Sequence, residues 1–169
     1  MTTPQSGAKL AVLMVCMGNI CRSPTAEGVL RHRLKAAGLA DRVVVDSAGT
    51  HGYHVGDPPD KRSQIHALRR GFDLSSMRAR RVAEADFTRF DLLLAMDDDN
   101  RAELLRICPP GREGQVQRLL DFATSTHGRR SVPDPYYSGS DGFDEVLDLV
   151  EDACDGLVAQ LLRRIDGTS

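Results

Sequence analysis

A short apolar run followed at once by a polar loop and a helical pattern constrains the fold more than any other part of this chain. Residues 10–15 are apolar without alternation and too few for a helix, which is typical of a strand buried on both faces. Residues 25–37 repeat their apolar positions with helical spacing. A buried strand joined tightly to a helix is the building unit of a parallel α/β sheet.

The loop between these two elements, residues 16–24, reads CMGNICRSP. A loop held between a buried strand and a helix N-terminus points its backbone N–H groups at one spot, where the helix dipole adds partial positive charge. The spot therefore favours an anion. A cysteine at the first loop position and an arginine further along place a thiolate beside a cavity shaped for phosphate. The sequence predicts a phosphatase that works through a phosphocysteine.

Each residue type in the loop suits this chemistry. Cys16 is the predicted nucleophile, because the thiolate is the reactive form and positive surroundings stabilise it. Arg22 offers a rigid fork of donors that matches two phosphoryl oxygens. Gly18 and Asn19 readily adopt the positive φ that a tight ring of amides needs. The loop residues expected to surround the phosphate are Met17, Gly18, Asn19, Ile20, Cys21 and Ser23.

Two residues of the loop have competing interpretations. A cysteine at the end of a buried strand is often an inert core thiol, and it is the complete loop that favours a nucleophile at Cys16. Ser23 and Pro24 suit the N-cap and the first position of the helix. Alternatively, the Ser23 hydroxyl hydrogen-bonds the sulfur and stabilises it as the leaving group when the phosphocysteine breaks down.

Residues 15–27, VCMGNICRSPTAE, resemble the signature of the low-molecular-weight protein tyrosine phosphatases, and DPYY at 134–137 resembles a second signature of that family. The resemblance extends over residues 8–165. It implies a single α/β domain (residues 1–169, with 1–7 a flexible tail). Its four parallel strands would take the order 2-1-3-4, with helices on both faces and the site at the carboxyl end of the first strand.

The aspartate of the second signature, Asp134, is the general acid in that family. The chemistry asks for such a group, because a phenol with a pKa near 10 leaves poorly without a proton. A carboxyl group supplies that proton and then acts as base on the hydrolytic water. Prolines on both sides stiffen the segment. Alone, Asp134 could simply begin a turn; beside Cys16 the catalytic interpretation is favoured.

Substrate preference depends on residues that the resemblance assigns. Tyr53 and Tyr136 would form aromatic walls of a slot for phenyl phosphate, with Tyr137 nearby, although ordinary half-buried tyrosines are the alternative. Protein arginine phosphatases of this fold carry threonine where this chain has Ile20, which favours phosphotyrosine. Many relatives brace the loop asparagine with a histidine; this chain has Met77 there, so we expect a looser network.

The other cysteines have different expected roles. Cys154 lies on an apolar helical stripe and is expected in the core, and Cys108 is structural or incidental. Cys21 lies inside the loop. We hypothesise that it condenses with peroxide-oxidised Cys16 to a disulfide that protects the nucleophile. The alternative is a small loop residue without a redox role.

Further strands are predicted at residues 42–46, 91–96 and 116–120, and further helices at 59–70, 99–107 and 143–165. Ile65 and Leu68 should face inward, and Gly71 should end their helix. Residues 122–132 are predicted to be a flexible loop. Asp97 is expected to face the loop arginine, and the acidic run that it begins is not expected to bind metal.

Composition limits the remaining possibilities. With 169 residues, 41% of them hydrophobic, the chain suits one domain, and its net charge of −2 gives no reason to expect nucleic acid or an anionic membrane as partner. No apolar stretch is long enough to span a membrane, and residues 1–7 are too polar for a secretory signal. Four cysteines without metal-type spacing suit a reducing compartment. We expect a cytoplasmic monomer without cofactors, acting on phosphotyrosine in proteins.

Two rival functions share these features. An arsenate reductase can use the same loop, but it needs a cysteine relay in a mobile segment, and residues 72–107 contain no cysteine. A non-catalytic phosphotyrosine-binding module would be expected to lose Cys16 or Asp134, and this chain keeps both.

Overall fold

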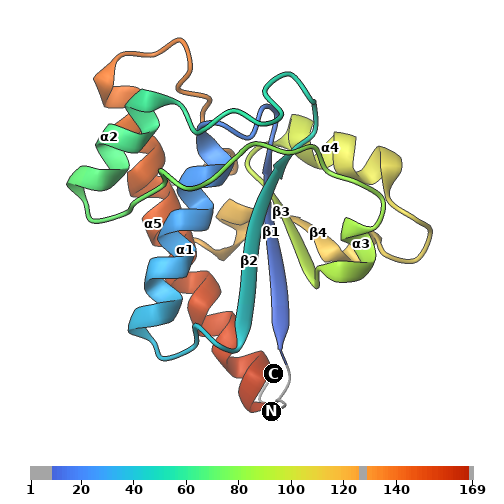
Figure 1. The fold of residues 1–169 in the computed structure, drawn as a ribbon. Coiled ribbons are helices and arrows are strands. Elements are labelled where there is room, and N and C mark those ends of the chain that lie inside the picture. Colours follow the sequence, from blue (N-terminus) through green and yellow to red (C-terminus); the bar gives the residue numbers. More distant parts are fainter. Residues whose placement is uncertain (1–8, 126–128, 168–169) are drawn as a thin grey trace.

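One parallel sheet lies between two layers of helices in the computed structural model, which describes residues 9–125 and 129–167 (Figure 1). The strand order, β2-β1-β3-β4, and the single α/β domain are as predicted. The strands are β1 (Leu10–Cys16), β2 (Val43–Gly49), β3 (Leu92–Ala95) and β4 (Val116–Arg118).

The predicted buried strand is β1, which pairs in parallel with β2 on one side and β3 on the other. Residues 12–15 of this strand are completely buried. Because successive side chains of a strand point to opposite faces, Val12 and Met14 pack into one core, and Leu13 and Val15 pack into the other. The unbroken apolar run is thus explained by two buried faces.

Helices cover both faces of the sheet (Figure 1). The elements are α1 (Arg22–Ala36), α2 (Lys61–Arg69), α3 (Asp86–Arg89), α4 (Asp98–Ile107) and α5 (Ser140–Asp166), with 3-10 turns η1 (Glu113–Gln115) and η2 (Leu119–Phe122). The helices α1 and α5 pack together on one face, and α4 packs on β3 and β4. Cys154 is fully buried on α5, as predicted. Over the described residues, no helix combines the length and apolarity needed to cross a bilayer.

The start of α1 differs from the prediction. The helix begins at Arg22 with Cys21 as N-cap, and no side chain caps it. Ser23 is therefore inside the first turn rather than at the N-cap, and Pro24 is not the first helical residue. The N-terminus of α1 follows directly on the loop of residues 16–21, where an anion can satisfy its first-turn N–H groups in place of a capping side chain.

The inward face of α2 was predicted wrongly. Ile65 and Leu68 are 50% and 62% exposed, whereas the buried residues are Ser63, His66 and Ala67. The helix meets α5 through His66, whose ring stacks on Phe143 with 5.5 Å between centroids. The apolar spacing therefore indicated the wrong side of the helix. Directly after the C-cap, Gly71 has a φ of +92°, in agreement with its predicted helix-ending role.

Other boundaries differ in smaller ways. The strand β2 continues to Gly49, because its pairing with β1 extends to Cys16. The strand β4 ends at Arg118, where the chain turns into η2, and the short α3 was not predicted. Of the predicted flexible loop, residues 123–125 and 129–132 contain no helix or strand, and 126–128 lie outside the described residues, as does the predicted tail, 1–7. The flexibility of both segments stays a prediction.

Candidate active site

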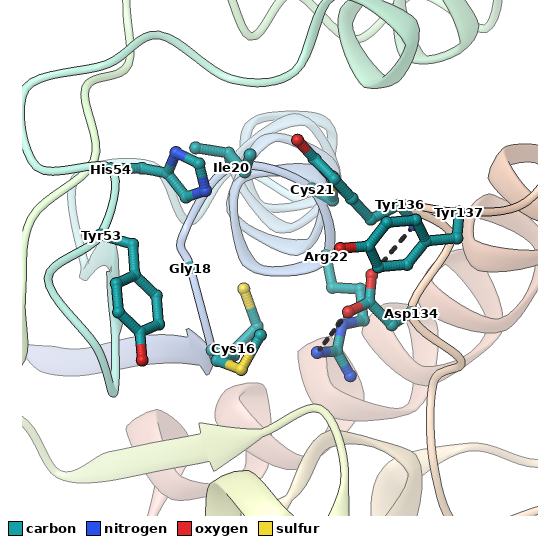
Figure 2. Close-up of a pocket in the computed structure, with 11 residues that line it drawn as sticks. Cys16, Gly18, Ile20, Cys21, Arg22, Tyr53, His54, Asp134, Tyr136 and Tyr137 are labelled. Carbon is teal, nitrogen blue, oxygen red and sulfur yellow. Dashed lines mark hydrogen bonds and ion pairs between the residues drawn. The ribbon is translucent and has the colours of Figure 1, made fainter.

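A pocket of about 300 Å³ opens at the carboxyl end of β1 (Figure 2). Its lining residues are Cys16, Met17, Gly18, Ile20, Cys21, Arg22, Tyr53, His54, Asp134, Tyr136 and Tyr137. The structure thus brings the predicted nucleophile, arginine, acid and aromatic walls together from three distant parts of the chain. Asn19 and Ser23, also predicted to surround the phosphate, are buried behind this lining.

Two hydrogen-bonding groups lie against the Cys16 sulfur in a nearly closed environment. The backbone N–H of Asn19 lies 3.3 Å from Sγ, and the Ser23 hydroxyl oxygen lies 3.0 Å from it. Cys16 is 3% exposed and Ser23 is completely buried. Of the two interpretations of Ser23, the contact with the sulfur is the correct one. Hydrogen-bond donors aimed at a sulfur atom stabilise negative charge on it.

Arg22 is buried, with 4% of its surface exposed, and its guanidinium is held in place by two hydrogen-bond acceptors. Its Nη1 donates to Asp97 Oδ2 at 2.6 Å and to the Val132 carbonyl at 3.2 Å. Burial opposes the charge of this guanidinium, but Cys16 and Asp97 outweigh burial, so the pKa of Arg22 lies above its ordinary value. The predicted contact between Asp97 and the loop arginine is confirmed.

Asp134 reaches the pocket from the loop before α5. Its Oδ2 lies 3.7 Å from Arg22 Nη2, and its Oδ1 accepts the Tyr136 backbone N–H at 3.0 Å. The Val132 N–H donates to the Met96 carbonyl at 2.7 Å, which fastens this loop to the end of β3. The carboxyl side chain is 42% exposed, so it can meet a substrate that enters from solvent.

Gly18 and Asn19 serve the loop in different ways. Asn19 has a φ of +58° and, among the described residues, is the one non-glycine residue with positive φ. Gly18 does not have a positive φ, contrary to the prediction. Its missing side chain leaves room for His54 instead, since a Cβ at Gly18 would lie 3.1 Å from His54 Cδ2. No local sequence pattern indicated His54, because only the fold brings it to the pocket.

The predicted aromatic walls lie on opposite sides of Cys16 in Figure 2, and each is supported by a neighbouring group. The ring of Tyr53 stacks on His51 at 5.2 Å between centroids. The guanidinium of Arg62 lies over the Tyr136 ring at 5.4 Å. Tyr137 is 95% exposed at the edge of the pocket. The pocket therefore presents aromatic faces to whatever group carries the phosphate.

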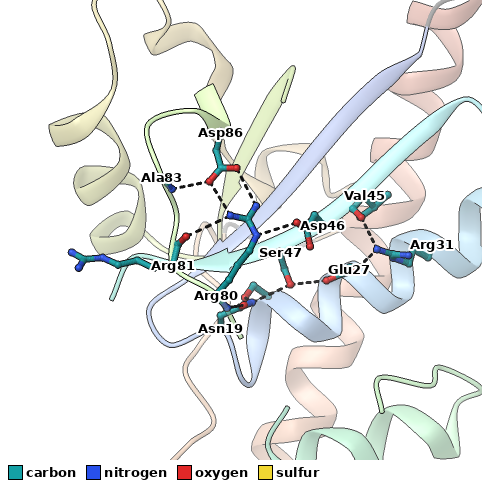
Figure 3. A network of polar contacts seen from close by, with 11 residues as sticks. Asn19, Glu27, Arg31, Val45, Asp46, Ser47, Arg80, Arg81, Ala83 and Asp86 are labelled. Atoms are coloured by element: carbon teal, nitrogen blue, oxygen red, sulfur yellow. Dashed lines mark hydrogen bonds and ion pairs between the residues drawn. The ribbon is translucent and has the colours of Figure 1, made fainter. Parts of the chain in front are cut away.

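The Asn19 side chain is fully engaged behind the loop (Figure 3). Its Nδ2 donates to Ser23 Oγ at 2.8 Å and to Ser47 Oγ at 3.0 Å, and its Oδ1 accepts the Arg80 N–H at 3.0 Å. Ser47 therefore braces Asn19. The Arg80 backbone N–H supplies the third contact, and the loosening effect of Met77 stays a prediction.

The remaining predicted residues are placed as follows. The thiols of all four cysteines are free. Burial raises the pKa of the Cys21 thiol to about 12. Asp98 and Asp99 form the first turn of α4, and Asp97 caps that helix by accepting the Asn100 N–H at 2.7 Å. In the described parts of the chain, no cluster of histidine, cysteine or acidic side chains has an arrangement suited to a metal ion.

Fold and site together define an α/β protein whose first strand ends in an anion-binding loop with a buried cysteine and arginine. Residues 11–166 match the family model described as low molecular weight phosphotyrosine protein phosphatase. The chain belongs to this family, whose members are enzymes.

Individual relatives agree over nearly the full length. A putative low molecular weight protein-tyrosine-phosphatase of Synechocystis is 45% identical over 152 residues, which cover 90% of this chain and 96% of the relative. The crystal structure of a protein tyrosine phosphatase from Entamoeba histolytica, with Hepes in its active site, matches with a TM-score of 0.88 and 41% identity, covering 92% and 98% of the two chains. A structure named as a Drosophila arginine phosphatase matches with a TM-score of 0.80 and 31% identity. The match covers 89% of this chain and 96% of the neighbour.

Proposed function

We propose that this protein hydrolyses phosphotyrosine in protein substrates through a phosphocysteine intermediate at Cys16. The observation that carries the proposal is the sulfur of Cys16, which faces a pocket together with a buried guanidinium and a carboxyl group. A thiolate with hydrogen-bond donors around it is a nucleophile suited to phosphorus. The fixed guanidinium and the loop amides are suited to the charge of the transferring phosphoryl group.

The proposed reaction has two steps. In the first, the Cys16 thiolate attacks phosphorus, the P–O bond to the phenol breaks, and Asp134 gives its proton to the departing phenolate. In the second, Asp134 takes a proton from a water molecule, which attacks phosphorus and releases phosphate. The S–P bond breaks and the thiolate is restored, and the Ser23 hydroxyl at 3.0 Å stabilises its returning charge. Neither step needs a cofactor or a metal.

Two features of the pocket support phosphotyrosine over phosphoarginine, which is the substrate class named for the Drosophila neighbour. Tyr53 and Tyr136 offer aromatic faces to a phenyl ring. Ile20, at the position where arginine phosphatases of this fold carry threonine, gives the lining an apolar side chain that cannot hydrogen-bond a guanidinium. We expect phosphoserine to be too short to reach Cys16 from the aromatic rim.

The same site suggests protection against oxidation. Peroxide would convert Cys16 to a sulfenic acid, and the Cys21 thiol would then displace water to form a disulfide. The buried Cys21 thiol, with its raised pKa, provides little thiolate at neutral pH, so we expect this step to be slow. If Cys21→Ser regained activity after peroxide and then dithiothreitol as completely as wild type, the protective role would be refuted.

We further propose a monomeric enzyme of the cytoplasm, without nucleic-acid or membrane partners. The net charge of −2 and the four free cysteines support this setting. Size-exclusion chromatography with light scattering would test the monomer.

The direct test is hydrolysis of aryl phosphates, phosphotyrosine peptide and phosphoarginine in the presence of EDTA. Wild type should cleave the tyrosine substrates, and Cys16→Ser should be inactive. Asp134→Ala should be slowed most for phenols of high pKa, because these need the proton. An inert wild type, or an active Cys16→Ser, would refute the proposal.

A further inference from the structure

A buried carboxylate lies directly behind the catalytic loop and has no part in the reaction described above. Glu27, one turn along α1 from Ser23, is 4% exposed. Burial raises its pKa, while Ser47 and Arg31 act in the opposite direction. The Ser47 hydroxyl donates to Glu27 Oε1 at 2.6 Å, and Arg31 Nη2 lies 2.6 Å from Oε2 (Figure 3). A buried charge of this kind is costly without its partners.

The contacts fix the direction of each hydrogen bond from Asn19 to the nucleophile. A backbone N–H can only donate, so the Asn19 atom that faces the Arg80 N–H is the oxygen. The amide nitrogen of Asn19 then donates to both serines. Ser23 Oγ accepts from Asn19, which leaves the hydroxyl hydrogen of Ser23 for the Cys16 sulfur.

The orientation of Ser47 depends on Glu27. With Glu27 ionised, the Ser47 hydroxyl hydrogen is committed to the carboxylate, and its oxygen is free to accept from Asn19. Without the carboxylate, that hydroxyl can turn toward Asn19, where it would compete with the amide N–H. Asn19 would then lose the contact that holds its amide in place.

We propose that the Glu27–Arg31 ion pair orders this hydrogen-bonded chain, so that Ser23 donates to the Cys16 thiolate during catalysis. The inference rests on the proposed function, and it makes Glu27 and Arg31 positioning residues that touch neither substrate nor sulfur. Arg31 also donates to the Val45 carbonyl at 2.6 Å, so its guanidinium is held between α1 and β2.

The charges around Glu27 support this assignment. From α1, Arg31 faces it directly, and from β2, Asp46 disfavours its ionisation. The charge of Asp46 is itself offset by Arg80, whose Nε lies 3.1 Å from Asp46 Oδ2. Removing Arg31 would therefore leave the buried Glu27 carboxylate without the cation that contacts it.

The test replaces Arg31 with methionine. Because the Arg31 side chain is 57% exposed, Arg31→Met is expected to fold. The matched control is Arg33→Met on the same helix, which breaks ion pairs to Glu151 and Asp155 that do not lead to the loop. The first readout is the rate at which iodoacetate alkylates Cys16, followed by mass spectrometry over a range of pH. The second readout is steady-state kinetics, from which kcat and KM are determined separately.

We expect Arg31→Met to raise the pH midpoint of Cys16 alkylation by about one unit and to lower kcat about tenfold, with KM nearly unchanged. Arg31→Lys should keep both the pH midpoint and kcat close to those of wild type. Glu27→Gln should raise the midpoint, as Arg31→Met does. The double variant, Glu27→Gln with Arg31→Met, should shift the pH midpoint no further than either single substitution, because both residues act on one chain of contacts.

A folded Arg31→Met whose alkylation midpoint and kcat match those of Arg33→Met would overturn the proposal. So would strict additivity in the double variant. Alkylation of Cys16 needs no phosphatase activity, so the midpoint still tests this inference if the protein proves inert toward phosphotyrosine. Failure of the proposed function and failure of this inference are therefore distinguishable.

Discussion

Asn19 combines two properties that few residue types share. Its backbone adopts a φ of +58°, which asparagine tolerates better than other residues with a side chain. Its amide spans the space between Ser23, Ser47 and the backbone of Arg80. Glycine would allow the same backbone but lose these contacts, and aspartate could not donate to either serine. One residue thus sets both the shape of the loop and the environment of the sulfur.

Asp97 has two separable tasks at the residue scale, since one oxygen holds Arg22 and the other caps α4. Asp97→Asn keeps a capping oxygen but removes the charge beside Arg22. We expect kcat/KM to fall about tenfold, the scale of a charged hydrogen bond, and the free energy of unfolding to fall as well, because the buried Arg22 loses its counter-charge. Asp97→Ala should add about 1 kcal/mol of destabilisation from the lost cap. Steady-state kinetics and urea unfolding separate the effects. Unchanged kinetics in Asp97→Asn would contradict this role.

Gly18 is predicted to matter for space rather than for backbone conformation. In Gly18→Ala the new Cβ would lie 3.1 Å from His54 Cδ2, so His54 must move at the edge of the pocket. We expect KM for aryl phosphate to rise about tenfold while kcat changes little. His54→Ala should relieve the conflict, so the double variant should recover most of the affinity. If Gly18→Ala raised KM equally in the wild-type and His54→Ala backgrounds, the loss of affinity would come from the loop backbone and not from His54.

At the scale of elements, the sequence was informative where one local pattern decides the outcome. The strand β1, the loop after it and the stripe of α5 follow from short-range spacing, and all were predicted. The face of α2 was not, because His66 packs on Phe143 and hydrogen-bonds Asp144 at 3.0 Å, contacts that no local pattern reveals. Likewise His54 and Arg80 reach the site only through the fold.

The orientation of α2 leads to a paired stability prediction. Leu68 is 62% exposed and its neighbour Ala67 is fully buried. Leu68→Gln should change the free energy of unfolding by less than about 0.5 kcal/mol, whereas Ala67→Gln should cost about 2 kcal/mol or more through overpacking and a buried amide. Urea denaturation measures both. The reverse order would mean that the original apolar pattern had indicated the packed face after all.

For the whole molecule, the surface carboxyl groups predict how stability depends on pH. Hydrogen bonds lower the pKa of Asp73, through the Ser75 N–H, of Glu103, through Arg106, and of Asp144, through His66. The folded state therefore binds these protons less tightly than the unfolded chain. Their contribution is present above about pH 4 and is lost as pH falls through the lowered values. Glu27 acts in the opposite direction, because burial raises its pKa.

We therefore expect the free energy of unfolding to fall as pH drops from about 5 to 3, and to fall less steeply in high salt, which screens exposed ion pairs. Urea unfolding at a series of pH values measures this. A free energy that rose over the same range would contradict the assigned directions.

The central claim, a covalent phosphoryl group on Cys16, can be measured directly. Rapid mixing with an aryl phosphate of low phenol pKa, followed by quenching and mass spectrometry, reports which residue carries phosphate. Asp134→Ala should accumulate the intermediate, because it lacks the base for the second step while a good leaving group needs no acid in the first. We predict one phosphoryl group on the peptide that contains Cys16. Turnover with no phosphoryl group on Cys16, or with one on another residue, would contradict the account.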